Sequence, residues 1–588
     1  METAESTTVR VAADLPFFAA ATFGDRPALR FKRGDEWQTQ SFTDLAAEIR
    51  DLGTGFIYAG VNAGDRVCII ADTRPEWSRA ALAVLATGAI LVPIYATSSP
   101  EECAWVIGNS GATVLIAENA AQLAKIESIG DQVPDLTTLI AIDADRPERL
   151  TLAELAEQGR RAPDSSELEA RRRAINPDDP SVIIYTSGTT GPPKGCVLTH
   201  RNWLALCRTI EELSYLRDDD VVYLFLPLAH VFAQIVQFGS LFAGSELAYF
   251  GGDVKRIVPE LAEVRPTFLP SVPRIFEKVY TLVTGGIDPE QRKQAVQLGL
   301  TVRALQRAGK RVPDELAGAW AATDALFAKV RAVYGGRLRQ ALTGAAPISV
   351  EVLQFFYAAG VPVLEGYGMT ETTAVGTVST LDRFKFGTVG VAGPGFGLKI
   401  AEDGEILMRG PHVFAGYWQD PEATAATVID GWMHTGDLGE LDADGFLTIT
   451  GRKKDIIITA GGKNIAPANL ENVLRQSRWI SHAVTFGDRK PYLVGLITLD
   501  EEEIVPWAAA RGLPTDLATL RTHPDVITLI QGVVDEANAR FATVAQIKRF
   551  ALLERDLTID TGELTPSLKV KRNVIHAHHA ELYDALYA

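Results

Sequence analysis

The sequence predicts an α/β protein in which helices cover layered β-sheets. Two observations predict this class: short runs rich in β-branched residues alternate with longer Ala- and Leu-rich segments, and those segments carry apolar residues at helical spacing. With 588 residues, of which 47% are hydrophobic, the chain exceeds what one core usually organises, so we expect a large domain and a smaller one. The predicted buried strands are residues 67–70, 113–116, 181–185, 221–225 and 361–364.

The boundary between the two domains is predicted near Lys454. Residues 451–467 (GRKKDIIITAGGKNIAP) place charges, glycines and a proline around one apolar strand, a composition typical of an exposed boundary. We therefore expect an N-terminal domain of residues 1–451 and a C-terminal domain of residues 452–588. From about residue 281 to 335, charged and Ala-rich sequence of helical spacing predicts a helical insertion.

Composition disfavours several classes of function. The chain carries 57 Lys and Arg against 74 Asp and Glu, and its formal net charge of −17 repels nucleic acid and anionic lipid. Its four cysteines have no metal-ligand spacing, which favours a reducing cytoplasm. The N-terminus lacks the basic start and apolar run of an export signal. We expect a cytoplasmic protein that binds no nucleic acid.

The longest apolar stretch, residues 80–96, is short for a bilayer span and contains Thr87, Gly88 and Pro93. It predicts a buried helix followed by a buried strand, not a transmembrane segment. Peripheral membrane contact stays open, as does the oligomeric state, with a homodimer one option. The closing His-rich residues 576–583 (HAHHAELY) are expected to form a solvated helix face.

The segment of residues 185–195 (YTSGTTGPPKG) directly follows a predicted strand. Glycines let a backbone turn closely around a phosphate, hydroxyls and amides donate hydrogen bonds, and a lysine supplies positive charge. The P-loop spacing GxxxxGK[ST] is absent, which disfavours an ordinary P-loop NTPase. The segment predicts a polyphosphate-binding loop, whose candidate residues are Thr186, Ser187, Gly188, Thr189, Thr190, Gly191 and Lys194.

Further motifs follow in a fixed order: TGAAP at 343–347, EGYGMTE at 365–371, HTGD at 434–437, GRKKD at 451–455 and LTPSLKVKR at 564–572. With the phosphate loop, they resemble the signatures of the adenylate-forming superfamily, which includes acyl-CoA synthetases, luciferases and the adenylation domains of peptide synthetases. The resemblance covers nearly the whole chain. It implies a large adenylate-forming domain, a smaller mobile α+β domain, and activation of an acid with ATP and Mg²⁺.

The resemblance also implies residue roles that fit the chemistry of the side chains. Tyr367 offers a flat ring to adenine, Thr370 a hydroxyl to the α-phosphate, and Glu371 a hard oxygen ligand to magnesium, with Thr186 as a second ligand. Glu371 alone also suits a helix cap, and Asp437 an Asx turn. The remaining ATP-binding candidates are Gly344, Ala345, Ala346, Glu365, Gly366, Tyr367, Gly368, Met369, Asp437 and Arg452, the last two toward ribose.

Lys569 is the predicted catalytic lysine, with Glu371 and Thr370 as catalytic partners. Joining a carboxylate to ATP requires positive charge where negative charge accumulates. Lys571 and Arg572 make a basic run that is usually a solvated face, and the match to the family motif selects Lys569. Lys454 matches the family hinge. Candidates for a CoA channel, or alternatively a simple hairpin turn, are Gly461, Gly462 and Lys463.

The preferred acid is expected to be a long-chain fatty acid, because residues 71–77, 226–232 and 271–280 resemble that branch of the superfamily. The candidate acyl pocket, whose residues equally suit plain core, consists of His230, Val231, Phe232 and Ile235. Coenzyme A is the expected acceptor, since no Ser-centred carrier motif occurs. Three alternatives stay open: delivery to a separate carrier protein, a luciferase-like oxygenase, and a nucleotide- or acyl-binding sensor without catalysis.

Overall fold

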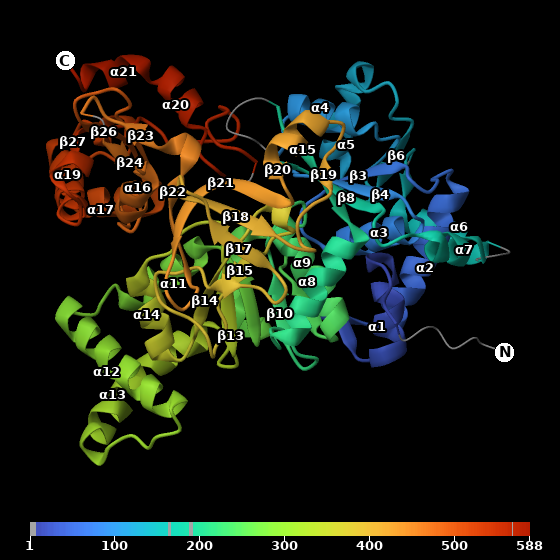
Figure 1. Cartoon of the computed structure of the whole chain (residues 1–588), viewed down its shortest axis with the longest axis horizontal. Helices are drawn as coiled ribbons and strands as arrows, with labels where there is room; N and C mark the ends of the chain where they lie inside the picture. Colours follow the sequence, from blue (N-terminus) through green and yellow to red (C-terminus); the bar gives the residue numbers. More distant parts are fainter. Residues whose placement is uncertain (1–7, 147, 163–165, 187–191, 462, 567) are drawn as a thin grey trace. The chain divides into compact units, whose positions relative to one another are not determined.

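The computed structural model describes residues 8–146, 148–162, 166–186, 192–461, 463–566 and 568–588 (Figure 1). The chain forms two compact units. The first unit comprises Met1–Ala346, Leu353–Leu398 and Met408–Met433, and the second comprises Pro347–Val352, Lys399–Leu407 and His434–Ala588. The predicted α/β class is confirmed in the first unit. The domain boundary between residues 451 and 452 stays a prediction.

A nine-stranded sheet forms one layer of the first unit, in the order β16-β15-β14-β13-β12-β10-β11-β1-β2. Its centre, from β14 to β1, is parallel, and antiparallel strands flank it on both sides. The predicted strands 221–225 and 361–364 correspond to β10 and β14. The bounds are β1 (Pro27–Arg33), β2 (Glu36–Ser41), β10 (Val221–Leu224), β11 (Glu246–Tyr249), β12 (Phe268–Ser271), β13 (Gln340–Thr343), β14 (Val363–Tyr367), β15 (Thr377–Val378) and β16 (Val391–Ala392).

A second sheet, of eight strands, follows the order β19-β9-β8-β4-β3-β5-β6-β7. It is parallel from β8 to β7, while β9 and β19 join antiparallel at the other edge. The bounds are β3 (Arg66–Ile70), β4 (Ile90–Ile94), β5 (Val114–Ala117), β6 (Thr138–Ala141), β7 (Leu150–Thr151), β8 (Pro180–Thr186), β9 (Lys194–Thr199) and β19 (Gly416–Tyr417).

The apolar stretch 80–96 is a buried helix followed by a buried strand, as predicted. It spans most of α3 (Pro75–Ala86) and all of β4, and β4 is buried at every position. Parallel strands covered on both faces have such continuous apolar runs. Among the helices within the described residues, none combines the length and the hydropathy that a membrane crossing requires.

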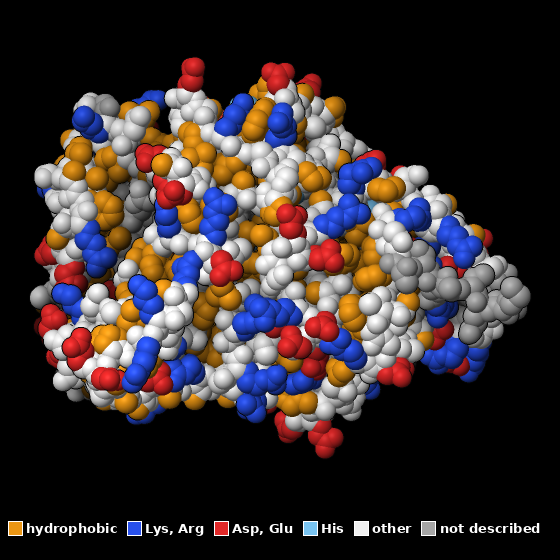
Figure 2. Space-filling model, turned by 60° about the horizontal axis from the view of Figure 1, so that its bottom comes forward, with side chains coloured by type: hydrophobic (Ala, Val, Ile, Leu, Met, Phe, Trp, Pro, Cys, Tyr) orange, Lys and Arg blue, Asp and Glu red, His pale blue; other side chains and the backbone are white. Residues whose placement is uncertain are grey.

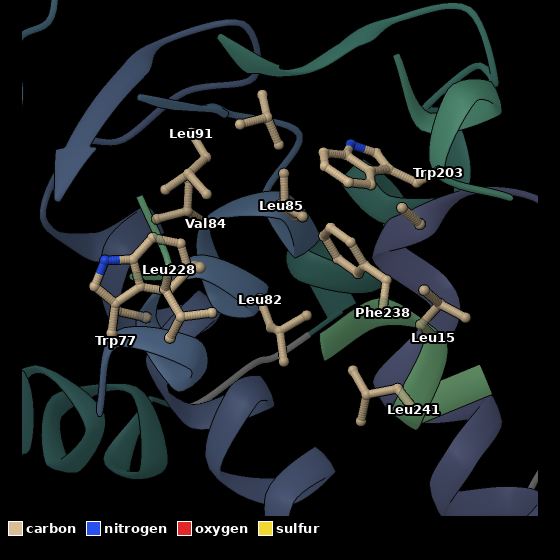
Figure 3. Close-up of a cluster of buried hydrophobic side chains, with 14 of the residues drawn as sticks. Leu15, Trp77, Leu82, Val84, Leu85, Leu91, Trp203, Leu228, Phe238 and Leu241 are labelled. Carbon is tan, nitrogen blue, oxygen red and sulfur yellow. The ribbon is translucent and has the colours of Figure 1, made fainter. Parts of the chain in front are cut away.

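Helices α1 (Leu15–Phe23), α3, α8 (His200–Glu212) and α9 (Val231–Ala243) share one hydrophobic core in the first unit. Figure 3 shows part of it, where the rings of Trp203 and Phe238 lie beside Leu85. The centroids of the two rings are 4.7 Å apart. Burying one such side chain contributes about 1.5–3 kcal/mol. All four cysteines are free and buried, and burial raises the pKa of their thiols, to about 12 for Cys103.

Helices occupy the segment for which a helical insertion was predicted. It consists of the end of α11 (Pro273–Thr284), α12 (Pro289–Arg307) and α13 (Asp314–Val333), drawn in yellow-green in Figure 1. Asp288 starts α12, because its carboxylate accepts hydrogen bonds from the amides of Glu290 and Gln291, and Pro289 occupies the first helical position.

The second unit has the predicted α+β character. Strands β25 (Ile480–Phe486), β26 (Leu493–Leu499) and β27 (Ile547–Leu552) form its three-stranded sheet. A separate five-stranded sheet, whose strands include residues of both units, contains β17, β18, β20, β21 and β22. The bounds of its strands are β17 (Gly397–Ile400), β18 (Glu405–Arg409), β20 (Val428–Ile429), β21 (Trp432–Leu441) and β22 (Leu447–Arg452). The helices of the second unit are α16 (Pro467–Leu474), α17 (Glu501–Ala509), α18 (Leu517–Leu520), α19 (Pro524–Asn538), α20 (Arg572–His578) and α21 (Ala580–Ala585).

The surface carries charges of both signs. Figure 2 shows Lys and Arg side chains interspersed with Asp and Glu, with apolar side chains between them. On that face, the acidic side chains are therefore interspersed with basic ones and are not gathered into one acidic patch.

Candidate nucleotide-binding and catalytic site

The two ends of the predicted phosphate loop are brought together by strands β8 and β9. Thr186 pairs with Lys194 in the antiparallel register, and the Thr186 hydroxyl lies 3.5 Å from the Lys194 carbonyl oxygen. This pairing is the expected base of a tight loop. Five of the predicted loop residues lie outside the described residues: Ser187, Gly188, Thr189, Thr190 and Gly191.

Glu371 lies next to this loop base, in the short 3-10 helix η4 (Thr370–Thr372). The Tyr417 hydroxyl donates a hydrogen bond to Glu371 Oε1 at 2.8 Å, and the Phe414 amide donates to the Glu371 carbonyl at 2.9 Å. The helix cap is made by another residue, since Thr372 Oγ1 accepts from the Met369 amide at 3.0 Å. The buried Glu371 carboxylate is therefore not used as a cap.

Cys196 connects Glu371 with Thr186. Its Sγ lies 3.7 Å from Thr186 Oγ1, and its thiol is hydrogen-bonded to the Glu371 carboxylate. Burial is the main reason why the thiol pKa is raised well above its usual value, and the nearby carboxylate raises it further. The neutral thiol is then a donor that helps to hold Glu371.

Tyr417 and Asp420 are site residues that the motif analysis missed. Lys194 Nζ lies 5.2 Å from the centroid of the Tyr417 ring and 3.8 Å from Asp420 Oδ2. Tyr417 therefore contacts both the phosphate-loop lysine and the predicted metal ligand Glu371. Tyr417 lies in β19, a two-residue strand that pairs with β9. Sequence periodicity cannot be recognised over two residues, so no sequence signal pointed to Tyr417.

The TGAAP and EGYGMTE motifs meet at the carboxyl ends of two parallel strands. Thr343 of β13 pairs with Glu365 of β14, and a Cβ added to Gly344 would lie 3.2 Å from the Gly366 carbonyl oxygen. Ligands of open α/β sheets bind at this edge of the strands. Ala345 follows with a positive φ of 67°, so the chain turns sharply there.

The EGYGMTE motif is shaped by close backbone approach and burial. A Cβ on Gly368 would lie 2.1 Å from the Ala374 carbonyl oxygen, so only glycine fits at that position. Burial raises the pKa of Glu365 to about 8. Tyr367 is half-buried and Thr370 is buried, whereas Ala346, at the end of the TGAAP turn, is exposed.

In the second unit, Asp437 and Arg452 face each other across β21 and β22. They are direct partners in the antiparallel register, and Arg452 Nε lies 2.9 Å from Asp437 Oδ1. Asp437 lies inside a strand, so the Asx-turn alternative does not apply. The two residues that were predicted to bind ribose are therefore neighbours.

Glu405 orders the HTGD motif. Its carboxylate accepts from the Gly436 amide at 2.8 Å and lies 3.0 Å from His434 Nδ1 and 2.8 Å from Lys453 Nζ. Burial opposes ionisation, but these partners lower the pKa of Glu405 overall. Lys453 begins η5 (Lys453–Asp455), which also contains the predicted hinge residue Lys454.

Lys569 lies on an exposed turn of the second unit. The Lys569 carbonyl accepts from the Thr565 amide at 2.8 Å, and the Lys569 amide donates to Thr565 Oγ1 at 3.0 Å. Arg572 is already engaged by Glu471, at 2.8 Å between Nη1 and Oε1. The choice of Lys569 as the reactive cation of this motif stays a prediction.

The predicted CoA-channel residues lie between β23 (Ile457–Ile458) and β24 (Asn464–Ile465), which pair antiparallel. Gly461 and Lys463 are part of this hairpin turn, where the Thr459 amide donates to the Lys463 carbonyl at 3.1 Å. Gly462 lies outside the described residues. The hairpin alternative is thus observed, and a role toward CoA stays a prediction.

The predicted acyl-pocket residues lie at the start of α9. His230 Nδ1 accepts from the Phe232 amide at 3.2 Å and caps the helix, while Val231 and Ile235 belong to the buried core. Gln234 is fully buried and donates to the Leu228 carbonyl at 3.0 Å. An acyl-binding role for these residues stays a prediction.

The His-rich end differs from the prediction of a purely solvated helix face. His576 and His578 are exposed, but His578 Nδ1 and His579 Nε2 lie 3.3 and 3.4 Å from the buried Glu563 carboxylate. Within the described residues, no group of three or more His, Cys, Asp or Glu side chains is arranged to hold a metal ion.

A magnesium ion bound with a nucleotide suits the residues around Glu371. Magnesium takes one or two protein oxygens and completes its shell with water and phosphate oxygens, so it needs no cluster of side chains. A buried carboxylate and a hydroxyl, Glu371 and Thr186, contact the same Cys196 thiol. This oxygen pair beside a phosphate loop fits the donor set that magnesium prefers.

Two family models match the chain. The model of AMP-binding enzymes covers residues 17–418, and that of the C-terminal domain of AMP-binding enzymes covers residues 454–588. Long-chain-fatty-acid–CoA ligase FadD15 of Mycobacterium bovis is 41% identical over 559 residues, 94% of this chain and 92% of that protein. Long-chain-fatty-acid–CoA ligase ACSBG2 of Xenopus laevis is 33% identical over 609 residues, 96% of this chain and 82% of that protein.

A solved structure agrees with these relatives on the fold. The adenylation domain of a carboxylate reductase from Mycobacterium chelonae matches with a TM-score of 0.78 at 21% identity, over 99% of this chain and 92% of that domain. The family models together span most of the sequence, and relatives above 30% identity cover nearly all of it. The chain therefore belongs to the family of AMP-binding enzymes.

Proposed function

We propose that this chain is an AMP-forming ligase that uses ATP and Mg²⁺ to activate a long-chain fatty acid and then transfers the acyl group to coenzyme A. The observation that carries the proposal is the convergence of Thr186, Lys194 and Glu371 at one loop base. It occurs in a chain whose relatives of nearly equal length are named long-chain-fatty-acid–CoA ligases.

The reaction has two steps. The fatty-acid carboxylate attacks the α-phosphorus of ATP, forming the acyl-phosphate bond of acyl-AMP and releasing pyrophosphate. The CoA thiol, after losing its proton, then attacks the acyl carbonyl carbon, forming a thioester and releasing AMP. No oxidant or reductant is required, and the acyl group keeps its carbon skeleton.

In the first unit, the protein binds and orients the polyphosphate. Lys194 supplies positive charge, Thr186 and Glu371 would hold the magnesium ion, and the Tyr417 hydroxyl keeps the Glu371 carboxylate in place. When bound, the ion neutralises phosphate charge that would otherwise repel the incoming carboxylate. Thr370, beside Glu371, would donate its hydroxyl to the α-phosphate.

In the second unit, Asp437 accepts hydrogen bonds from ribose hydroxyls, with Arg452 holding its carboxylate from the facing strand. Lys569 stabilises the negative charge that builds up as the carboxylate and the α-phosphate approach each other. We place the reaction in the cytoplasm, where free buried thiols such as those of this chain persist.

A fatty-acid panel tests the proposal. Acids from short to long chain length are supplied with ATP and Mg²⁺, and pyrophosphate release and acyl-CoA formation are measured separately. The proposal expects both products, with the highest kcat/KM for long chains. Pyrophosphate without thioester would indicate a ligase that delivers to a carrier protein, and neither product would indicate a nucleotide- or acyl-binding sensor.

A further inference from the structure

The turn that carries Lys569 is a small hairpin with a defined base. Leu564 and Val570 form an antiparallel bridge, and the Lys571 amide donates to the Glu563 carbonyl at 2.8 Å. Leu568, near the tip, is exposed and has a positive φ of 60°. A short turn with an exposed apolar residue in this conformation has little stability of its own, so its placement depends on the base.

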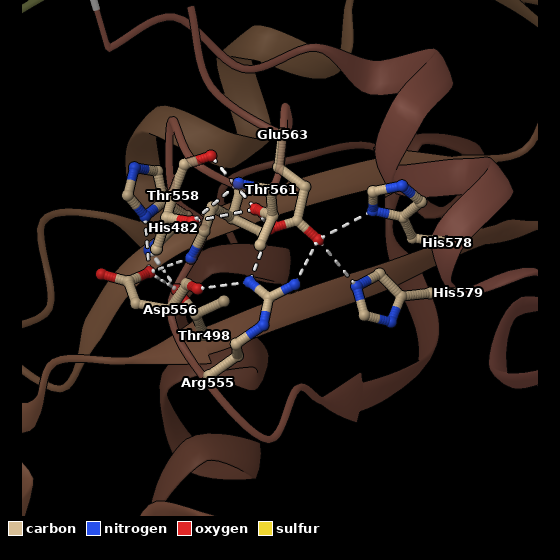
Figure 4. A network of polar contacts seen from close by, with 10 residues as sticks. His482, Thr498, Arg555, Asp556, Thr558, Thr561, Glu563, His578 and His579 are labelled. Carbon is tan, nitrogen blue, oxygen red and sulfur yellow. Dashed lines mark hydrogen bonds and ion pairs between the residues drawn. The ribbon is translucent and has the colours of Figure 1, made fainter. Parts of the chain in front are cut away.

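One end of the base is fixed by Glu563, whose side chain is fully buried. Arg555 binds its carboxylate with two nitrogens, at 2.6 Å from Oε2 and 3.0 Å from Oε1. Figure 4 shows His578 and His579 reaching the same carboxylate from the C-terminal helices, at 3.3 and 3.4 Å. Glu563 thereby ties the hairpin to two other segments of the unit.

The ionised state of Glu563 is strongly favoured. Burial opposes it, but hydrogen bonds from Arg555, Thr561 and His578 outweigh burial and lower the pKa to about 2. A bidentate pair of this kind fixes direction as well as distance. The carboxylate therefore serves as a rigid attachment and not as a proton donor at neutral pH.

The other end of the base is fixed by Arg572. Its guanidinium lies 2.8 and 3.0 Å from the two carboxylate oxygens of Glu471 in α16, and it also donates to the Thr485 carbonyl at 2.6 Å. The two ion pairs lie on opposite arms of the hairpin, at residues 563 and 572. Neither pair involves the Lys569 side chain.

We propose that Glu563 and Glu471 are positioning residues for Lys569: each holds one arm of the hairpin, and together they set where the lysine is presented for adenylation. This inference rests on the proposed function, in which Lys569 acts in the first half-reaction. A displacement of about 1 Å in a reacting group is enough to cost on the order of 100-fold in rate, so loosening the base is expected to show in catalysis.

The test measures the two half-reactions separately on the full-length chain. Glu563→Gln and Glu471→Gln are each assayed for pyrophosphate release with ATP and fatty acid, and for thioester formation from preformed acyl-AMP and CoA. We expect the adenylation kcat to fall about tenfold or more in each variant, with KM for ATP nearly unchanged. Thioester formation is expected to stay within about twofold, because it does not use Lys569.

Asp556→Asn is the matched control. Asp556 neighbours Arg555 and accepts hydrogen bonds from Ser481, His482 and Thr498 at 2.6–2.8 Å, yet within the described residues its side chain has no contact with the hairpin. The same loss of one charge is expected to affect both half-reactions equally or not at all. If Glu563→Gln folds poorly, Arg555→Gln, which changes a half-exposed side chain, removes the same ion pair.

Each outcome separates the inference from the proposed function. If Lys569→Ala abolishes adenylation while both glutamine variants retain it, the positioning role is wrong and the proposed function stands. If Lys569→Ala itself leaves adenylation intact, the positioning inference and the role assigned to Lys569 are overturned, while the ligase activity stands; if the parent chain forms neither pyrophosphate nor thioester, the proposed function fails. If the two half-reactions fall together in parallel with the melting temperature, the carboxylates stabilise the unit and have no specific positioning role.

Discussion

At the scale of single residues, Tyr417 contacts two residues of the proposed phosphate-binding region. Its hydroxyl donates to Glu371 Oε1 at 2.8 Å, while Lys194 Nζ lies over its ring at 5.2 Å from the centroid. A partner that orients a metal ligand typically changes metal affinity or activity by about 10–100-fold when it is removed.

Tyr417→Phe is expected to raise the Mg²⁺ concentration for half-maximal adenylation about tenfold, because the ring stays but Glu371 loses the hydrogen bond from the Tyr417 hydroxyl. Pyrophosphate release titrated with Mg²⁺ measures this. Tyr223→Phe is the matched control, since its hydroxyl donates to a different glutamate, Glu260, also at 2.8 Å. An equal Mg²⁺ requirement in both variants would refute the role of Tyr417.

Glu365 provides a pH-dependent contribution to stability. Its pKa is raised from 4.5 to about 8 by burial, so the folded chain holds a proton there between these pH values that the unfolded chain has lost. Glu365 therefore lowers the free energy of unfolding in a pH-dependent way. This destabilisation is absent below pH 4.5, grows as the pH rises and is complete above about pH 8.

Glu365→Gln is expected to remove this pH dependence. At pH 9 the variant should unfold at a Tm at least about 2–4 °C above that of the parent, the equivalent of about 1 kcal/mol. At pH 4.5 the two proteins should melt together. Thermal melts across this range measure the difference, and a constant offset at all pH values would contradict the assigned cause.

Sequence patterns pointed to candidate site residues where a motif is contiguous. They missed candidate residues such as Tyr417 and Glu405, which reach the motifs only through strand pairing or long-range contacts. The pairing of Asp437 with Arg452, both chosen from motifs, is observed at 2.9 Å. Tyr417 and Glu405 act through contacts 46 and 29 residues away in sequence, to Glu371 and His434. Such contacts depend on sheet register, which no local pattern encodes.

At the scale of elements, helices α2 (Phe42–Tyr58) and α6 (Leu152–Arg161) cross at very short distance. A Cβ added to Gly159 would lie 1.9 Å from the Asp51 carbonyl oxygen, and one added to Gly55 would lie 2.2 Å from the Leu155 carbonyl oxygen. Glycines at both contact points let the two backbones touch, so the crossing has no room for a methyl group.

Gly159→Ala is expected to destabilise the first unit by about 3 kcal/mol, because backbone atoms must move apart to admit the methyl group. Gly108→Ala in α4 (Pro100–Ser110) is the control: nothing lies within 4 Å of its Cβ position, and alanine should stabilise that helix by about 0.5–1 kcal/mol. Chemical denaturation measures both, and equal effects would contradict the close crossing.

Elements were predicted well where hydrophobic runs are long. The strand 67–70 and the apolar stretch 80–96 lie where β3, α3 and β4 are observed. Two-residue strands such as β19 and β24 were not predicted, because periodicity cannot be measured over two positions. These short strands nevertheless hold Tyr417 and the turn of Gly461.

At the scale of the whole molecule, the candidate residues are divided between two compact units. Thr186, Lys194 and Glu371 belong to the first, and Asp437, Arg452 and Lys569 to the second. The alternation of strand-like and helix-like segments predicted the α/β class. The boundary between the two domains was predicted only from a segment near Lys454 whose composition is typical of an exposed region. Strands β17, β18 and β21 each contain residues of both units, a continuity that composition does not reveal.

Lys569→Ala is expected to reduce the rate of adenylation by about 100-fold or more, because the variant loses the positive charge that stabilises the carboxylate and the α-phosphate as they approach each other. Thioester formation from preformed acyl-AMP should remain near the parent rate. Both rates are measured on the same preparation. An equal fall in both half-reactions would contradict the assignment of the lysine to the first step alone.

The burial of all four cysteines bears on the fate of the activated acid. Acyl-AMP is a mixed anhydride that reacts with any thiolate it meets, including those of the protein that made it. Because burial raises the pKa of Cys68, Cys103, Cys196 and Cys207, each remains an enclosed, protonated thiol at neutral pH. Acylation of the protein's own cysteines is thereby disfavoured relative to acylation of a thiol that is free in solution.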